Sequence, residues 1–339
     1  MQMFKSILLC AAVMQSFAVS SFVDRFEQWI KKFELRVEND LHYRTLFANW
    51  KSNDQFIVDH NLKNLTYTLG HNQFSGMDRE QYRAYLGYSS EGDLTKINLR
   101  GNAFLHKTDA NAVPASVNWV EKGGVTPVKD QGQCGSCWSF SVTGALEGAF
   151  FNEYGSLTSF SEQQLVDCDN LKNGGKDHGC NGGLMDNAFS WIGKNGGLCT
   201  ENDYPYVSGE TKAAGTCQKT CSVIGDSKVA KFVDVPPSSD TDMMSAVSMR
   251  PVSVAIEADQ REFQLYESGV FIGECGTNLD HGVLVVGYGS LNGDDYYLIK
   301  NSWGTTWGSK GYIYVGRGKQ YNKGDGQCGV LLEASYPVL

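Results

Sequence analysis

The chain has 339 residues, 41% of them hydrophobic and 20% charged, which is enough for two folding units. This composition is ordinary for a globular protein and excludes a disordered or low-complexity chain. The formal net charge is -9, and residues 113–339 hold 26 acidic against 16 basic residues. No basic face is evident, so we expect no nucleic-acid partner.

Residues 1–20 have the pattern of a secretory signal peptide. Lys5 gives a positive start, residues 7–14 form an apolar run too short to span a bilayer, and Ala18 and Ser20 suit cleavage after Ser20. The alternative is an uncleaved anchor. Because no other long apolar run follows, we expect a mature protein without a membrane span that meets an oxidising environment.

Residues 21–112 form a mainly helical front part. Two amphipathic helices are predicted between residues 22 and 61, since apolar and polar residues recur there at spacings of three and four: Phe22, Phe26, Trp29, Ile30 and Phe33, then Leu46, Trp50, Asn53, Ile57 and Asn61. Residues 65–70 alternate like a strand, and residues 87–111 read as a linker. Asn64 lies in an Asn-x-Thr glycosylation motif, with an unmodified Asn as the alternative.

A buried helix is predicted from about Cys137 to Asn152, ended by Gly155. Cys137 then lies in its first turn, where the partial positive charge and free N–H groups of the helix favour a thiolate. A thiolate is the reactive form of cysteine, and it needs a partner to hold the proton.

Two histidines follow residue 113. His178 lies in a glycine-rich polar loop, and we interpret it as solvated. His281 precedes an apolar run at residues 282–289 that reads as a buried strand, and the strand at residues 296–300 leads to Asn301. An Asn side chain can accept a hydrogen bond from one imidazole nitrogen and leave the other facing the sulfur.

Further strands are predicted at residues 311–316 and 333–338. The region 137–200 is mostly helical and the latter half mostly β, which indicates an α+β fold of two lobes. Because Cys137 and His281 fall in different halves, a cleft between the lobes would bring them together.

Ten cysteines are present, and loss of Cys10 with the signal leaves nine, so one thiol is unpaired. Cys134 and Cys137 form a Cys-x-x-Cys with two alternative interpretations. Zinc would need two more ligands, which Cys217, Cys221 or His178 could in principle supply. A redox pair would want a preceding buried strand, and residues 125–128 are a poor one.

The motif Cys134-Gly-Ser-Cys137-Trp138, with His281 and Asn301 far downstream, resembles the papain-like cysteine proteases and, among them, the cathepsin L-like group. The resemblance runs from about Phe26 to Leu339. It implies a two-lobed fold with a helical lobe and a β-barrel-like lobe, preceded by a propeptide, and no cofactor or metal. It also implies that Cys137 is the nucleophile, His281 the acid–base partner, Asn301 the orienting residue and Gln131 an oxyanion-hole donor.

The same resemblance implies a peptide-binding cleft. Gly182 and Gly183 match a strip whose backbone pairs with substrate, Trp303 an indole that shields the His–Asn bond, and Trp307 a wall on the leaving-group side. The pocket for the substrate residue two before the cut would be lined by five residues: Leu184, Met185, Ala255, Leu279 and Glu333. Asp280 is also expected to contact the substrate. A carboxylate at Glu333 would add a preference for Arg to one for apolar side chains. The alternative is that Glu333 faces solvent.

Three disulfides follow from the resemblance, Cys134–Cys180, Cys168–Cys217 and Cys275–Cys328. Cys199 and Cys221 are left over, and we predict that they pair, although exchanged partners among Cys199, Cys217 and Cys221 stay open. Cys137 is then the free thiol.

The front part resembles the family's inhibitory propeptide. Trp50, Asn53, Ile57 and Asn61 match its long helix motif, but His42 and Leu46 stand where Glu and Arg are usual. Residues 70–74 match the next motif, and Gly76 replaces an Asp associated with acid-triggered processing. Residues 113–119 resemble a mature start, so we expect cleavage near residue 112.

These matches predict a signal peptide at 1–20, an inhibitory propeptide at 21–112 and a peptidase domain at 113–339. The expected product is a monomeric endopeptidase of protein and peptide substrates, in a lysosome or vacuole or outside the cell, restrained by its own propeptide and by cystatin-like inhibitors. The alternatives are a non-enzymatic protein on the same scaffold, and a front part that acts as a free inhibitor after release.

Overall fold

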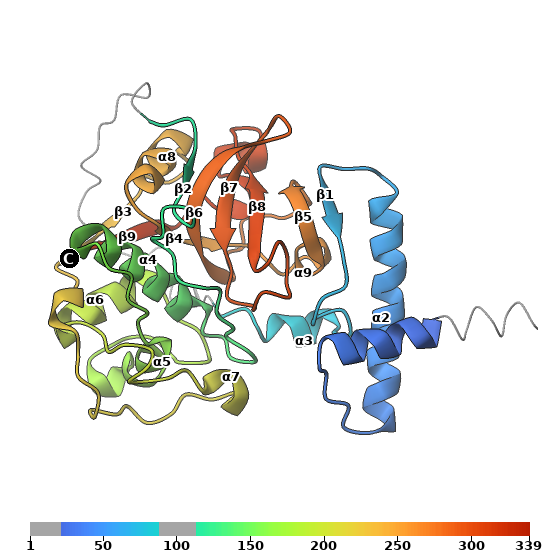
Figure 1. Cartoon of the computed structure of the whole chain (residues 1–339), viewed down its shortest axis with the longest axis horizontal. Coiled ribbons are helices and arrows are strands. Elements are labelled where there is room, and N and C mark those ends of the chain that lie inside the picture. Colours follow the sequence, from blue (N-terminus) through green and yellow to red (C-terminus); the bar gives the residue numbers. More distant parts are fainter. Residues whose placement is uncertain (1–21, 88–112) are drawn as a thin grey trace, which may run out of the picture.

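The computed structural model describes residues 22–87 and 113–339, which form a small front segment packed against a larger body of two lobes (Figure 1). The predicted signal peptide, the predicted linker at 87–111 apart from Gly87, and the cleavage site near residue 112 lie outside the described residues. In the described part, no helix has the length and apolar character needed to cross a membrane.

The front segment (residues 22–87) consists of a helix over residues 22–32, α2 (Asp40–Asn61), β1 (Tyr67–Leu69) and α3 (Arg79–Arg83). The predicted helical faces are confirmed, because Phe26, Trp29, Leu46 and Trp50 form a small core of their own. Leu46, where the motif usually has Arg, belongs to this core. Gly76 packs beneath it, and a Cβ there would lie 2.6 Å from the Trp29 ring, which explains the absence of a longer side chain.

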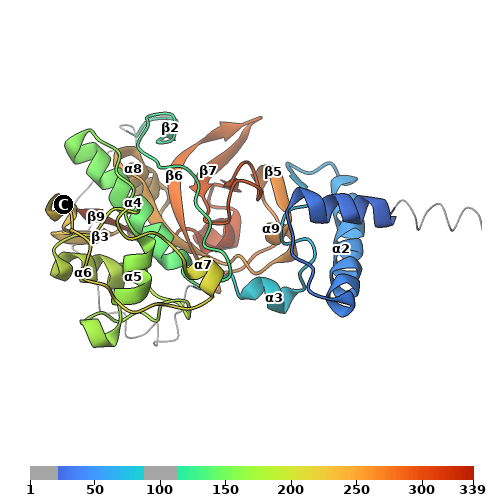
Figure 2. The ribbon, with the colours of Figure 1, turned by 60° about the horizontal axis from the view of Figure 1, so that its bottom comes forward.

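The helical lobe contains α4 (Cys137–Tyr154), α5 (Glu162–Cys168), α6 (Met185–Asn195) and α7 (Ser208–Thr211). The helix α4 ends as predicted at Gly155, whose φ of 70° is the left-handed conformation that glycine adopts readily. Almost every side chain of α4 is buried, because the helix lies between the other helices and the sheet (Figure 2). A helix buried on all sides gives its first residue a fixed position.

The β lobe is built from the strands β2 to β9, together with the helices α8 (Asp240–Met249) and α9 (Arg261–Gln264). The strands are β2 (Val117–Asn118), β3 (Lys231–Asp234), β4 (Val252–Ile256), β5 (Tyr266–Phe271), β6 (His281–Leu291), β7 (Asp294–Lys300), β8 (Tyr312–Gly316) and β9 (Ala334–Val338). Their order is β5-β8-β7-β6-β4-β9-β3, with β2 beside β6. The front segment adds β1 to the edge of this sheet, where Thr68 pairs with Ser268.

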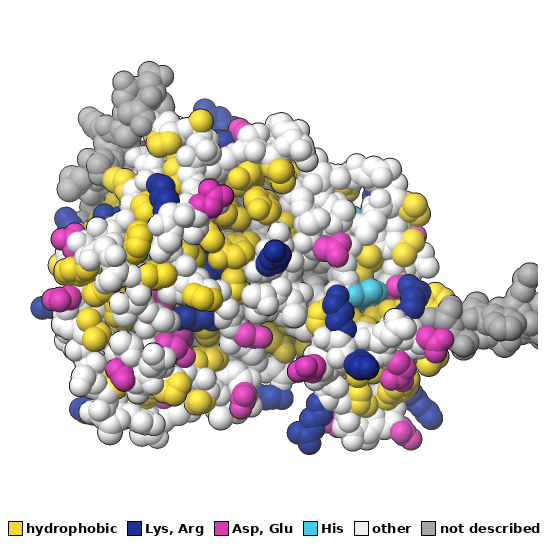
Figure 3. Space-filling model, viewed as in Figure 1, with side chains coloured by type: hydrophobic (Ala, Val, Ile, Leu, Met, Phe, Trp, Pro, Cys, Tyr) yellow, Lys and Arg dark blue, Asp and Glu magenta, His cyan; other side chains and the backbone are white. Residues whose placement is uncertain are grey.

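Four disulfides are formed, Cys134–Cys180, Cys168–Cys217, Cys199–Cys221 and Cys275–Cys328. All four predicted pairs are therefore confirmed, including the additional bond between Cys199 and Cys221. Among the cysteines of the described residues, Cys137 alone is free. Acidic and basic side chains are interspersed on the face of the molecule that Figure 3 shows.

Candidate active site

Cys137 is the first residue of α4, and its side chain is fully buried. The backbone N–H of Gly282 donates a hydrogen bond to its sulfur at 3.3 Å. A Cβ on Gly282 would lie 3.2 Å from Cα of Trp138, so a glycine after His281 lets β6 approach the start of α4 closely. The helical lobe thus supplies the sulfur and the β lobe supplies the residues that face it.

His281 is the first residue of β6, and its Nε2 lies 2.8 Å from Oδ1 of Asn301. Since Oδ1 also accepts from the backbone N–H of Ser302, it is the acceptor and Nε2 is the donor. The other ring nitrogen, Nδ1, has no hydrogen-bond partner among the described residues. In this tautomer Nδ1 carries a free lone pair, and the next residue, Gly282, contacts the Cys137 sulfur.

Trp303 covers this pair, with its ring stacked on the imidazole at a centroid distance of 4.5 Å. The indole is fully buried and excludes water from the His281–Asn301 bond. A shielded hydrogen bond holds the imidazole in one orientation.

Burial controls the charges of the two reactive groups. It raises the pKa of the Cys137 thiol to about 11, although backbone N–H groups of Gly282, Gly87 and Trp138 act in the opposite sense. Burial also lowers the pKa of His281 to about 4, although the hydrogen bond that its Nε2 donates to Asn301 acts to raise it. The helix start was expected to favour a thiolate, but in this state burial outweighs it, and both groups are neutral.

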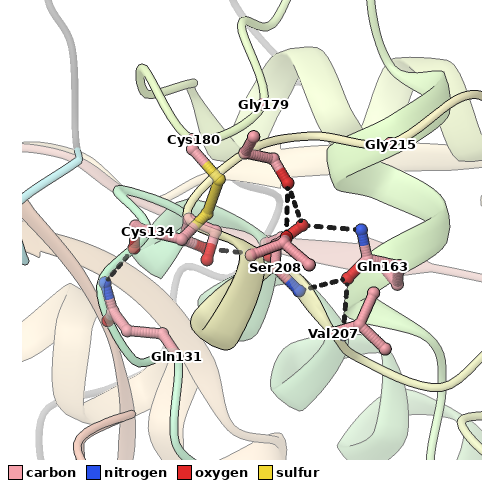
Figure 4. The surroundings of a disulfide bond; sticks show 12 residues. Gln131, Cys134, Gln163, Gly179, Cys180, Val207, Ser208 and Gly215 are labelled. Atoms are coloured by element: carbon pink, nitrogen blue, oxygen red, sulfur yellow. Dashed lines mark hydrogen bonds between the residues drawn. A yellow bond between two sulfur atoms is a disulfide. The ribbon is translucent and has the colours of Figure 1, made fainter.

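Gln131 is buried before the start of α4 and donates from Nε2 to the carbonyl oxygens of Tyr85 and Cys134, both at 2.8 Å. Its Oε1 accepts from the Ser302 hydroxyl at 2.7 Å, which fixes the orientation of the amide. Figure 4 shows Gln131 next to Cys134, whose disulfide to Cys180 ties this turn to the following loop. An amide N–H held on a carbonyl oxygen is the arrangement of an oxyanion-hole donor.

The front segment crosses the site between Tyr85 and Gly87. The carbonyl of Gly87 accepts from the backbone N–H of Gly183 at 3.1 Å, on the strip predicted to pair with substrate. A Cβ on Gly87 would lie 1.9 Å from the carbonyl oxygen of Gly135, so only glycine fits there without a shift of backbone.

An aromatic cluster anchors the same segment beside the sulfur. The rings of Phe74 and Tyr82 pack edge-on against Trp303, with centroid distances of 5.2 and 5.6 Å. The rings of Trp303 and Trp307 also pack edge-on, with a centroid distance of 5.0 Å. Figure 2 shows α3 at the junction between the front segment and the two lobes, so the segment both reaches and covers the site.

Comparison with known proteins decides the family. A model of the papain family of cysteine proteases matches residues 113–338, and a model of the cathepsin propeptide inhibitor domain matches residues 26–82. The chain belongs to the papain family of cysteine proteases. The front segment is its propeptide inhibitor domain and is called the propeptide below.

Relatives and solved structures agree with this assignment. The chain is 47% identical over 293 residues to the probable cysteine protease RD21B of Arabidopsis thaliana, which covers 86% of this chain and 60% of that protein. It therefore spans less than two thirds of that relative. The recombinant stem bromelain precursor superposes with a TM-score of 0.83 at 36% identity, covering 94% of this chain and 99% of that chain. Digestive procathepsin L 3 from the Tenebrio molitor larval midgut superposes with a TM-score of 0.81 at 36% identity, again covering 94% of this chain and 99% of that chain.

A cavity of about 850 Å³ opens beside the papain-family site. Its lining includes Leu279 and Glu333 of the predicted specificity pocket and Asp280, a predicted substrate contact. Leu86 of the propeptide and Leu332 line it too, and sequence reasoning missed both. Leu184, Met185 and Ala255 are not part of that lining, although the N–H of Ala255 donates to the Glu333 carbonyl at 3.0 Å.

Glu333 is half-buried, and burial followed by the charge of Asp234 raises its pKa above the ordinary value. The alternative that Glu333 faces open solvent is therefore disfavoured.

The two alternatives for Cys134 and Cys137 lose their basis. Cys134, Cys217 and Cys221 are each held in a disulfide, and His178 is exposed, as predicted. Within residues 22–87 and 113–339 no group of three His, Cys, Asp or Glu side chains is placed to hold a metal ion. Sequence reasoning missed Ser302 as the partner of Gln131, although it follows Asn301 directly in the chain.

Proposed function

We propose that this chain is the proform of a cysteine endopeptidase that cleaves peptide bonds in proteins and peptides. The observation that carries the proposal is the hydrogen bond from Gln131 to the Tyr85 carbonyl, next to a free cysteine and an oriented histidine. The propeptide places a peptide carbonyl where a substrate would present one. The sequence carries no long insertion of the kind that would block one end of a cleft, and this favours cutting within chains.

The chemistry follows from the positions of four side chains. Once the propeptide leaves, water reaches Cys137 and His281, and the cost of charging them falls. The thiolate attacks the substrate carbonyl, and Gln131 and the Cys137 N–H stabilise the oxyanion. The His281 imidazolium gives its proton to the leaving amine and then activates water, which hydrolyses the acyl-enzyme. Asn301 keeps the ring in its working orientation, and Trp303 shields their bond.

Substrate would lie along the surface that the propeptide now occupies. Gly182 and Gly183 would pair with the substrate backbone on the acyl side, and Trp307 would border the leaving group. Leu279 and Glu333, with Leu184, Met185 and Ala255 adjoining, would take the side chain two residues before the cut, and Asp280 would also contact the substrate. We propose that this pocket accepts apolar side chains and also Arg, which Glu333 binds when ionised.

The proposed processing removes a signal at residues 1–20 and the propeptide 21–112, leaving residues 113–339 as the peptidase. The mature enzyme is proposed to be a monomer inhibited by cystatin-like proteins and located in a lysosome or vacuole or outside the cell. Asn64, exposed in the propeptide, is the proposed glycosylation site.

Acidification of the purified proform tests this function. The expected result is cleavage near residue 112, the appearance of peptidase activity and labelling of Cys137 by an E-64-type epoxide. The Cys137→Ala proform is the matched control and should stay intact and inactive. A folded wild-type protein whose Cys137 stays inert after removal of the propeptide would show a non-enzymatic relative instead.

A further inference from the structure

Asp259 is the point at which charged groups of the propeptide meet the catalytic body. Its Oδ2 accepts from Nη2 of Arg79 at 2.8 Å and from Nη2 of Arg83 at 2.5 Å. Burial acts to raise the pKa of Asp259, but the two guanidinium groups lower it below the ordinary value. Among the described residues, the ion-pair partners of Asp259 both belong to the propeptide, so propeptide removal leaves this carboxylate without them.

The position of Asp259 follows from the elements on either side. It lies between β4 and α9 in the chain. The ring of Phe263 in α9 packs against those of Trp303 and Trp307, with centroid distances of 5.9 and 5.4 Å. The carbonyl of the neighbouring Ala258 accepts from the Tyr82 hydroxyl. Asp259 is therefore on the Trp303 and Trp307 side of the site.

The path of the propeptide gives the same result. Three successive hydrogen bonds mark this path. Arg83 bonds to Asp259, the Tyr85 carbonyl to Gln131, and the Gly87 carbonyl to the N–H of Gly183. Asp259 and Gly183 thus lie on opposite sides of the Cys137 region. If Gly183 holds the acyl part of a substrate, Asp259 faces the part that follows the cut.

The surroundings of Asp259 are acidic and open. Asp259, Asp280 and Glu257 line the 850 Å³ cavity, which also reaches Leu279 and Glu333 of the pocket predicted for the residue two before the cut. In the described structure the basic lining residues of this cavity are Arg79 and Arg83. Asp280 accepts from the N–H of Ala258, and Glu257 from the N–H groups of Gly276 and Asn278, so backbone bonds hold both carboxylates in place. The nearby Arg261 donates instead to Asn53 and Ser52 of the propeptide.

We propose that in the mature enzyme Asp259 is a specificity-determining residue that binds an Arg or Lys side chain two or three residues after the scissile bond. The substrate cation would replace the guanidinium groups of Arg79 and Arg83. Arg83 stands two positions from Tyr85, whose carbonyl lies on Gln131, and this spacing sets the expected distance from the cut. The inference rests on the proposed peptidase function and adds a preference on its leaving-group side.

The test uses activated enzyme and internally quenched peptides with one fixed acyl side. The second and third residues after the cut are varied together as Arg, Lys, Gln or Glu. We expect wild-type kcat/KM to be roughly three- to tenfold higher for Arg than for Gln, and lower still for Glu. In Asp259→Asn the Arg-to-Gln ratio should fall to about one. Glu262→Gln is the matched control, because it removes the same charge from a carboxylate that contacts Tyr67 instead of an arginine.

Each outcome bears on one claim. Equal cleavage of the Arg and Gln peptides by wild type, or a preference kept in Asp259→Asn, would overturn the inference while peptidase function stands. A ratio lowered equally by Glu262→Gln would also overturn it, because general surface charge would then suffice. No cleavage of any peptide would overturn the proposed function. Should Asp259→Asn fail to fold as a proform, the wild-type ratio is measured at low and high salt, and a ratio that salt does not lower refutes the ion pair.

Discussion

Gly87 offers a direct test of how the propeptide blocks the site. In Gly87→Ala the new methyl group would lie 1.9 Å from the oxygen and 2.2 Å from the carbon of the Gly135 carbonyl. Both atoms are backbone and cannot rotate away, so the propeptide has to lift by about 1 Å or more. Two hydrogen bonds are then strained or lost, from Gly183 to Gly87 and from Gln131 to Tyr85.

Each of these bonds contributes about 0.5–1.5 kcal/mol net, so the closed state should lose about 1–3 kcal/mol. That corresponds to a roughly 5- to 150-fold larger population of open proform. The assay is the rate at which an E-64-type epoxide labels Cys137 in the intact proform at neutral pH, followed by mass. Glu80→Ala, at an exposed position of α3, is the control and should label at the wild-type rate. Equal labelling rates for wild type and Gly87→Ala would refute the assigned block.

Three further predictions concern specificity, acid response and the additional disulfide. Peptides with Arg or Phe two residues before the cut should be compared, and the ratio of their kcat/KM values should rise with pH as Glu333 ionises. Because the pKa of Glu333 is raised, the rise should occur at a higher pH than an ordinary carboxyl group would give, and Glu333→Gln should remove it. Because burial lowers the pKa of His281 to about 4, the unfolded chain takes up that proton first as pH falls below 6.5. As pH falls from 6.5 to about 4, the unfolding free energy of the Cys137→Ala proform should therefore fall more steeply than that of Cys137→Ala/His281→Gln. Identical slopes for the two proteins would contradict the lowered pKa of His281. Replacing both Cys199 and Cys221 by Ala should lower the unfolding free energy by about 3 kcal/mol, since the bond closes a loop with a sequence separation of 22. Denaturant unfolding measures this loss, and non-reduced mass mapping that finds a free thiol at either position would disprove the bond.

The sequence predicts where Cys137, His281 and Asn301 lie in the fold because each stands at the end of a strongly patterned element. The apolar run after residue 137 predicts α4, and the strand patterns after His281 and before Asn301 predict β6 and β7. Residues at such ends have positions that follow from the fold. The aromatic spacing of the front segment likewise predicts its small core.

Contacts between distant parts of the chain are beyond sequence reasoning. The pairs of Asp259 with Arg79 and Arg83 span 180 and 176 positions, and nothing near either end of the pair indicates the other. The burial that raises the pKa of Cys137 and lowers that of His281 comes from tertiary packing, which local motifs do not report. Leu332 escaped notice in the same way, because the lining of a cavity depends on tertiary packing.

Capture of the covalent intermediate tests the central claim most directly. Activated protein is mixed with a slowly hydrolysed peptide ester, quenched in acid and mapped by mass spectrometry. The account predicts an acyl group on Cys137, and none on the intact proform or on activated His281→Ala. Hydrolysis of the ester with no acyl group on Cys137, or with the acyl group on another residue, would contradict it.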